Sequence, residues 1–193
     1  MQDILGHFAQ LLRFSGRERA GSFWPYAGVV FGLMMTASFV VFVPEIFRTF
    51  IGMQQFAVEH PESATITQGP GHYEISIEGA HPELMPDFAF LSGAMAAVAV
   101  VSVVLLAAAV TRRLHDAGRS GVWGLLPLPF LFCGFALMAN MFASLGTKAE
   151  PDFGQILLLF ANNAIYMGTL VLLVILLVRR GEANENRFGP KPA

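Results

Sequence analysis

Four long stretches of apolar residues dominate the pattern along this chain, and polar residues gather between them and at both ends. The stretches cover Ala20–Pro44, Phe88–Thr111, Ser120–Thr147 and Phe153–Val178. Each exceeds the ~20 apolar residues that an α-helix needs to cross ~30 Å of hydrocarbon. The pattern therefore predicts an all-α membrane protein in which residues 1–193 form a single domain with four transmembrane helices.

Composition supports a membrane location. Hydrophobic residues make up 54% of the 193 residues and charged residues only 13%, against ~25% charged in soluble domains. A soluble domain of this size could not bury so much apolar surface in one core, whereas lipid removes that need. The formal net charge of −2 says little, because the charges are segregated along the chain.

The basic residues alternate with the apolar stretches. Ten of the twelve Lys and Arg residues precede the first stretch, separate the second from the third, or follow the fourth. They are Arg13, Arg17, Arg19, Arg112, Arg113, Arg119, Arg179, Arg180, Arg187 and Lys191. By the positive-inside rule, both termini, the central connection and a tail of residues 179–193 are expected in the cytoplasm of a bacterium, with the chain in its inner membrane.

Two segments outside the spans have patterns of their own. Residues Met1–Phe14 place apolar side chains at helical spacing, which suits a short amphipathic helix in the membrane interface or one packed on the bundle. Residues 48–86 form a largely acidic extracytoplasmic insertion within a predicted loop from Glu45 to Asp87. Alternating residues on both sides of Gln68–Gly71 predict a small β-hairpin in this loop.

Charged and polar side chains are most concentrated in the segment Arg112–Trp123, between the second and third spans. Arg112 and Arg113 are each at helical spacing from Asp116, so either could pair with it, and Gly118 is suited to end the helix. One interpretation is a helical hairpin anchored to anionic lipid headgroups. The other is a binding site for a phosphate-bearing ligand or a protein partner, because guanidinium groups suit bidentate contacts with phosphate.

Three blocks of sequence resemble the signatures of one family. They are Phe14–Arg17 followed by Phe23–Trp24, then Arg112–Trp123, and finally Glu185–Pro190. Together they resemble domain-of-unknown-function family 805, a family of small bacterial inner-membrane proteins. The resemblance implies a membrane location but no reaction. It directs attention to one set of candidate binding residues on the cytoplasmic face, namely Arg17, Arg112, Arg113, His115, Asp116, Arg119, Trp123 and Arg187.

Other polar residues give weaker signals. Asn140, Asn162 and Asn163 lie within predicted spans, where polar side chains either bond other helices or line a solute path. His60, His72 and His81 share the acidic insertion and are either solvated or sensitive to external pH. Their spacing matches no compact metal motif, and we expect no metal, no cofactor and no nucleic-acid partner.

Three functions are compatible with these features. The first is a non-enzymatic accessory or regulatory protein that contacts anionic lipids and binds a protein partner or a second copy of itself. The second is a small channel or carrier that uses Asn140, Asn162 and Asn163. The third, an enzyme that acts on lipid phosphate through Arg112, His115 and Asp116, is disfavoured because these residues bring no metal set, second carboxylate pair or phosphate-binding loop.

Overall fold

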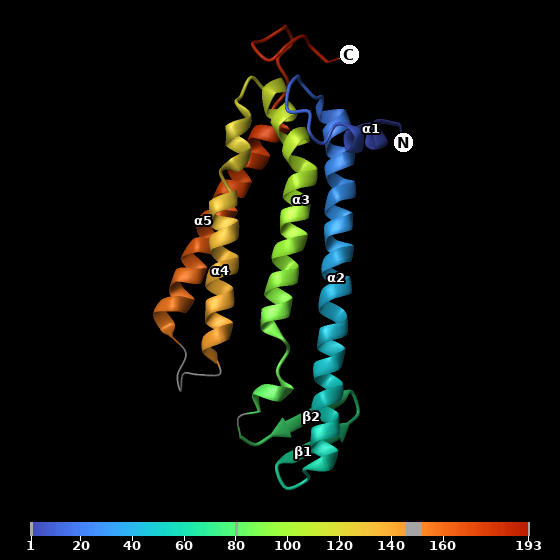
Figure 1. Ribbon diagram of the computed structural model, residues 1–193, viewed down its shortest axis with the longest axis vertical. Helices are drawn as coiled ribbons and strands as arrows, with labels where there is room; N and C mark the ends of the chain where they lie inside the picture. The colour runs from blue at the N-terminus through green and yellow to red at the C-terminus, as the bar shows by residue number, and fades with distance from the viewer. Residues whose placement is uncertain (1, 80, 146–151, 193) are drawn as a thin grey trace.

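The computed structural model shows four long helices side by side, one of which extends past the others to a small hairpin at one end (Figure 1). It describes residues 2–79, 81–145 and 152–192. The α-helices are α1 (Gln2–Ala9), α2 (Ala20–Glu59), α3 (Phe88–Asp116), α4 (Leu128–Leu145) and α5 (Phe153–Val178). Strands β1 (Ala64–Gly69) and β2 (His72–Ile77) and the short 3-10 helices η1 (Pro82–Leu84) and η2 (Gly121–Leu125) complete the described part.

Four helical segments are long and apolar enough to cross a membrane, as predicted: Ala20–Glu59, Pro82–Asp116, Gly121–Ser144 and Phe153–Val178. The bounds of α5 match the prediction, whereas the predicted third span ends at Thr147, outside the described residues. The third span begins with η2 and becomes α-helical only at Leu128. The cause is the pair of prolines at the start of that span, because proline cannot donate an N–H to a helical ladder.

The prediction of a loop from Glu45 onward is wrong over its first part, because α2 continues past Pro44 to Glu59. Its 40 residues span about 60 Å, roughly twice the thickness of the hydrocarbon core. Buried or half-buried positions recur at Glu45, Thr49, Gly52, Met53 and Phe56, which is the spacing of one helical face. That face packs on the hairpin and η1, so tertiary contacts outweigh the local effect of Pro44.

The predicted hairpin is present. β1 and β2 pair antiparallel, with Ala64 opposite Ile77 and Ile66 opposite Ile75. The Tyr73 ring lies 5.8 Å from the Phe50 ring of α2, and the Tyr73 hydroxyl lies 3.0 Å from the Gln54 amide nitrogen. Because an isolated two-stranded hairpin is marginal in water, these contacts with α2 are what support it.

Glu45 joins α2 to the start of α3. Its carboxylate accepts hydrogen bonds from the Arg48 guanidinium at 2.5 Å and from the Asp87 N–H at 2.7 Å. Asp87 in turn caps α3 by accepting from the Phe90 N–H at 2.8 Å. A residue that the sequence pattern assigned to a loop is therefore part of the helix packing.

α1 is shorter than the predicted helix over Met1–Phe14, and it lies across the start of α2 (Figure 1). Its His7 ring stacks on the Tyr26 ring at 4.4 Å, and the Phe8 ring meets Tyr26 edge-on at 5.6 Å. The described contacts therefore fit a helix packed on the bundle. A position of α1 in the membrane interface stays a prediction.

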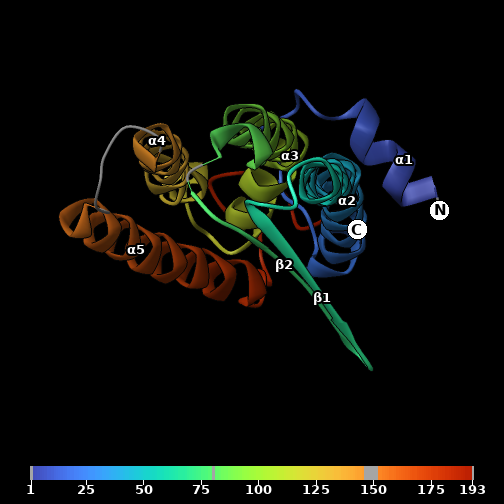
Figure 2. The same ribbon diagram turned by 90° about the horizontal axis from the view of Figure 1, so that it is seen from below.

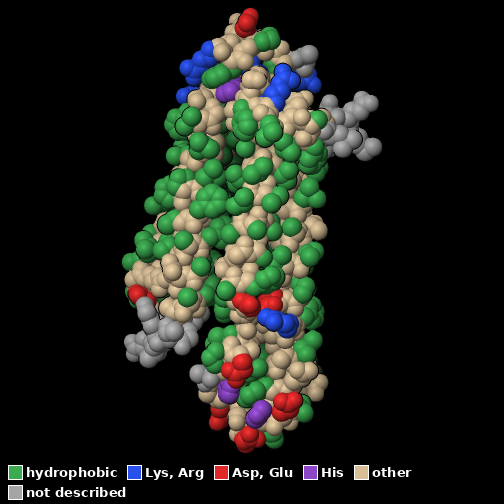
Figure 3. Space-filling model, viewed as in Figure 1, with side chains coloured by type: hydrophobic (Ala, Val, Ile, Leu, Met, Phe, Trp, Pro, Cys, Tyr) green, Lys and Arg blue, Asp and Glu red, His purple; other side chains and the backbone are tan. Residues whose placement is uncertain are grey.

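The buried core lies near the end of the bundle that holds both termini. It joins three helices through Phe23, Tyr26, Val30, Ala109, Leu114, Leu173, Leu176 and Leu177. Away from this core, α2 packs mainly on α3 and α4 mainly on α5, and α5 runs obliquely to the other helices when the bundle is viewed along its length (Figure 2). The remaining apolar side chains cover the outside of the helices (Figure 3), as expected of a surface in lipid.

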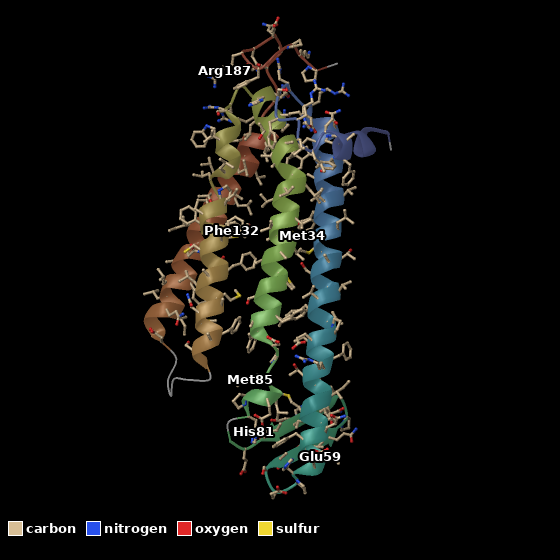
Figure 4. All side chains as sticks on the ribbon, viewed as in Figure 1. Met34, Glu59, His81, Met85, Phe132 and Arg187 are labelled. Atoms are coloured by element: carbon tan, nitrogen blue, oxygen red, sulfur yellow. The ribbon has the colours of Figure 1, made fainter. Side chains whose placement is uncertain are left out.

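Charge divides the molecule into two ends (Figure 3). We call the end with residues 13–19, 112–119 and 179–192 the basic end. We call residues 48–86, at the opposite end, the arm. Figure 4 shows Arg187 at the basic end, and Glu59, His81 and Met85 on the arm.

Replacing Phe56 by Ala should loosen the hairpin without unfolding the bundle. The Phe56 ring stacks on His60 at 4.4 Å and lies 4.5 Å from the His81 ring, so it holds the residues on both sides of the hairpin against α2. We expect amide hydrogen exchange in residues 64–77 to accelerate about tenfold or more. Val58→Ala, at a side chain 73% exposed on the same helix, should leave exchange unchanged. Equal exchange in both variants would contradict this packing.

Candidate functional site

The three sequence blocks that carry the family resemblance meet at the basic end. Arg17 belongs to the first block, Asp116 to the second and Asn186 to the third. They are brought together because α2 begins, α3 ends and α5 ends at this end of the bundle (Figure 1). We call the contacts among Arg17, Arg113, Asp116 and the tail the junction.

Asp116 is the centre of the junction and is 5% exposed. Its Oδ1 accepts from the Arg17 Nε and Nη2 at 3.1 and 3.0 Å, and its Oδ2 accepts from the Arg113 Nη1 at 2.6 Å. One carboxylate is thereby shared by two guanidinium groups. Buried charges of this kind are tolerated only when they are paired and their remaining hydrogen-bonding groups are satisfied.

The same two arginines bind the backbone of the tail. Arg17 donates to the carbonyl oxygens of Glu182 at 2.5 Å and Asn184 at 2.7 Å. Arg113 donates to the carbonyls of Leu177, at 2.9 Å, and Arg179. These carbonyls lie at and beyond the end of α5, where no further helical turn supplies N–H groups. The guanidinium groups therefore cap α5 and fix the path of the tail.

Close approach of the tail to Asp116 requires Gly181. The Glu182 N–H donates to the Asp116 carbonyl at 2.9 Å, and a Cβ on Gly181 would lie 2.1 Å from the Asp116 Oδ2. Two arginines hold that carboxylate in place, so it could not move aside. Gly118 has a φ of +70° and ends α3, as its position in the sequence predicts.

A second buried ion pair joins the first block to α3. The Glu18 Oε2 accepts from the Arg112 Nε at 3.0 Å, and its Oε1 lies 2.5 Å from the His7 Nε2. Arg112 also donates to the carbonyls of Gln10 at 3.2 Å and Arg13 at 2.6 Å. Of the two arginines that could pair with Asp116 by spacing, the structure selects Arg113, and Arg112 turns to Glu18.

His115 holds the last block. Its ring stacks on the Phe188 ring, with centroids 3.9 Å apart and planes 4° from parallel. The Asn186 amide donates to the His115 carbonyl at 3.0 Å, and the His115 Nδ1 lies 3.1 Å from the Gly16 carbonyl. The residues most suggestive of catalysis in the sequence thus contact other parts of the chain, and no buried side-chain nitrogen or oxygen of the described residues lacks a hydrogen-bond partner.

Three of the candidate residues lie on the surface of the basic end. Arg119 and Arg187 are exposed, and the Arg187 guanidinium lies 4.7 Å from the centre of the Phe188 ring. Trp123, in η2, is 42% exposed. Of the candidate residues, these three have the side chains most available to a lipid or a partner.

The three intramembrane asparagines do not converge. The Asn162 amide, on α5, donates to the Phe130 carbonyl of α4 at 2.9 Å and is 8% exposed. Asn140 and Asn163 lie on exposed surfaces of α4 and α5. Asn162 therefore joins two helices, and the described residues show no hydrogen bond between the asparagines.

A family model described as "Protein of unknown function (DUF805)" matches residues 11–190. The chain belongs to this family. No curated protein and no solved structure matches the chain. The match covers nearly the whole chain, so the resemblance seen in the three blocks is confirmed, and in this DUF805 protein those blocks form one connected set of contacts.

Two residues of the second buried ion pair, Glu18 and His7, were not anticipated from sequence. Glu18 stands between Arg17 and Arg19 and carries a carboxylate into an otherwise basic segment, which was a usable signal. His7 gave no comparable signal, because it pairs with Glu18 and Tyr26 only once α1 folds back on α2. Among the described residues, no three His, Cys, Asp or Glu side chains gather as metal ligands.

The histidines of the arm have separate surroundings. The His60 Nδ1 lies 3.3 Å from the Phe56 carbonyl, and the His72 Nε2 lies 3.2 Å from the Glu74 carboxylate. The His81 Nδ1 lies 2.9 Å from the Glu83 carboxylate, and its Nε2 lies 3.1 Å from the Glu78 carbonyl. The bond to Glu83 raises the pKa of His81 above its ordinary value, and the bond to Glu78 acts in the same direction.

The raised pKa of His81 should make the packing of the arm sensitive to pH. A His whose pKa is raised on folding contributes stability below its unfolded pKa, and this contribution is lost as pH rises through the folded pKa. We expect Glu83→Gln to lower the His81 pKa measured by NMR titration. Glu62→Gln, at an exposed carboxylate that makes no contact with His81, should leave it unchanged. An unaltered His81 pKa in Glu83→Gln would be evidence against the contact.

Asp116→Asn should destabilise the whole bundle. It removes the negative charge shared by two buried guanidinium groups, and such a loss typically costs about 3–5 kcal/mol of unfolding free energy. Unfolding in detergent, followed by circular dichroism, measures this cost. Glu185→Gln neutralises an exposed carboxylate at the same end and should change stability by less than about 0.5 kcal/mol. Similar stabilities for the two variants would show that the junction is not structural.

Proposed function

We propose that this chain is a non-enzymatic accessory or regulatory protein of the bacterial inner membrane. In this proposal the arm docks on the extracytoplasmic face of a larger membrane assembly, and the basic end faces the cytoplasm. The observation that carries the proposal is the extension of α2 beyond the other helices to hold a hairpin outside the bundle (Figure 1).

The surface of the arm suits a protein partner. It carries five glutamates against one arginine, and all five glutamates are exposed. Six large apolar side chains of the arm are exposed, namely Phe50, Ile51, Val58, Ile66, Tyr73 and Met85 at 41%, 49%, 73%, 42%, 41% and 48%. Apolar side chains surrounded by charge are typical of protein interfaces, in which the charges guide association. The acidic charge favours a partner with a basic surface.

The contacts of the junction support a role without catalysis at this end. Arg112, Asp116 and His115 each contact another part of the chain, so a substrate would have to displace bonds that hold the bundle together. The exposed Arg119, Trp123 and Arg187 provide the surface that we propose for cytoplasmic contacts. Their chemistry suits anionic lipid headgroups or an acidic protein surface.

The orientation in this proposal follows from charge. The start of α2, the end of α3 and the end of α5 carry the arginines, while Arg48 stands among acidic residues at the opposite end. The positive-inside rule then assigns the basic end to the cytoplasm and the arm to the extracytoplasmic side. Beyond the adjoining backbone of α2 itself, no heavy atom of the described residues lies within 4 Å of the Cβ positions of Gly28 and Gly32, so this face is open to a second copy or another helix.

Photo-crosslinking in native membranes tests the proposal. A benzoylphenylalanine at Tyr73 should form a discrete adduct with one protein, identifiable by mass spectrometry. Charge reversal at Glu59→Lys with Glu62→Lys should abolish that adduct, because both carboxylates are exposed on the arm. The matched control reverses Glu182 and Glu185, exposed carboxylates at the basic end, and should leave the adduct intact.

Two results would count against this function. One is the absence of any discrete adduct from Tyr73 and from Ile66. The other is an adduct whose yield is unchanged when Glu59 and Glu62 are both replaced by Lys, since the partner would then not recognise the acidic surface of the arm.

A further inference from the structure

A basic hollow lies beside the junction and shares the residue Arg17 with it. Its volume is about 530 Å³, and it opens between α1, the segment of residues 13–19 and the tail at residues 190–192. Among its lining residues are Arg13, Arg19, Ser22 and Lys191. These residues belong to segments that are distant in sequence, so the hollow exists only in the folded chain.

The hollow has an excess of positive charge. Its one lining carboxylate, Glu18, is bound by Arg112 and His7, and its lining Arg17 is bound to Asp116. The side chains of Arg13, Arg19 and Lys191 are exposed, and among the described residues these side chains form no ion pair or hydrogen bond. Three cations therefore face one hollow, and in the part of the chain that the structure describes no carboxylate is left to neutralise them.

The first turn of α2 adds to this positive potential. Arg19 is the N-cap residue of α2 and supplies no side-chain acceptor, and the first turn holds no acidic residue. Ser22, in that turn, lines the hollow. The unpaired N–H groups and the dipole of a helix start favour an anion, above all a phosphate. Here they act together with side-chain cations that converge from other segments.

Apolar side chains beside the hollow indicate that the anion belongs to a lipid. Arg13 stands between Leu12, which is 88% exposed, and Phe14, which is 46% exposed. Trp24, the fifth residue of α2, is 40% exposed at the same end of the bundle, and indole rings favour the boundary between headgroups and acyl chains. A free phosphate ion makes no favourable contact with exposed apolar side chains, whereas the acyl chains attached to a lipid phosphate do.

We propose that this hollow binds the phosphate group of an anionic membrane phospholipid. Arg13, Arg19 and Lys191 contact the phosphate oxygens, and Leu12 and Phe14 enter the adjoining acyl region. The site differs from the surface of Arg119, Trp123 and Arg187, and it is independent of the arm. It would tie α1 and the tail to the membrane at one point.

Lipid retention by the purified full-length chain tests the site. The probes are short-chain phosphatidylglycerol, short-chain phosphatidylcholine and inorganic phosphate, each titrated in neutral detergent and followed by native mass spectrometry. Arg13→Gln with Arg19→Gln should weaken phosphatidylglycerol binding by about an order of magnitude, since each basic residue near a lipid surface contributes substantially to attraction. Because both side chains are exposed and unpaired, the variant should keep the unfolding midpoint of the parent chain.

The matched control is Arg179→Gln with Arg180→Gln. It removes two exposed arginines from the same end of the bundle, neither of which lines the hollow. It should change phosphatidylglycerol binding less than twofold. If the two double variants lose phosphatidylglycerol affinity equally, the loss reflects general electrostatic attraction to the basic end. That result would contradict a specific site in the hollow.

A second variant separates the two sources of phosphate. Leu12→Ser with Phe14→Ser should weaken binding of phosphatidylglycerol but leave all the cations in place. Inorganic phosphate that competes as strongly as the lipid, together with unchanged lipid binding in this apolar variant, would assign the hollow to a free anion. Preference for phosphatidylcholine over phosphatidylglycerol would also refute the proposal.

Discussion

The shared carboxylate of Asp116 is the interaction on which the rest of this structure depends. Arg17 approaches it from the segment before α2 and Arg113 from α3, and both arginines continue to the carbonyls of the tail. In hydrocarbon, apolar side chains give little preference for one helix neighbour over another, because lipid is equally apolar. Polar contacts at the membrane boundary can therefore specify which helix ends meet. The buried core of Phe23, Leu114 and Leu177 lies beside these contacts.

This arrangement gives the three signature blocks of the family a structural role. The three blocks are far apart in the chain, yet Arg17, Asp116 and Asn186 take part in one set of contacts. Residue types common in catalysis are used here to bond helices and a tail. The charged side chains that other molecules can reach lie elsewhere. They are on the exposed acidic arm, on the arginines that face solvent at the basic end, and in the hollow beside α1.

Sequence patterns predicted the spans well because lipid imposes a simple rule of length and polarity on each of them. The start and end of α5 followed from that rule. The continuation of α2 past Pro44 did not, since it depends on the hairpin and on Glu45 bonding to Asp87. Pairing of Arg112 with Glu18 was also beyond reach, because residues 94 positions apart become neighbours only through packing.

The coupling free energy between Arg17 and Asp116, two residues 99 positions apart, tests the central claim most directly. A double-mutant cycle with Arg17→Gln and Asp116→Asn, read by unfolding in detergent, isolates this energy from the cost of each change alone. The shared carboxylate predicts a favourable coupling of at least about 1 kcal/mol. Additive effects, with a coupling near zero, would contradict a junction that holds the three blocks together.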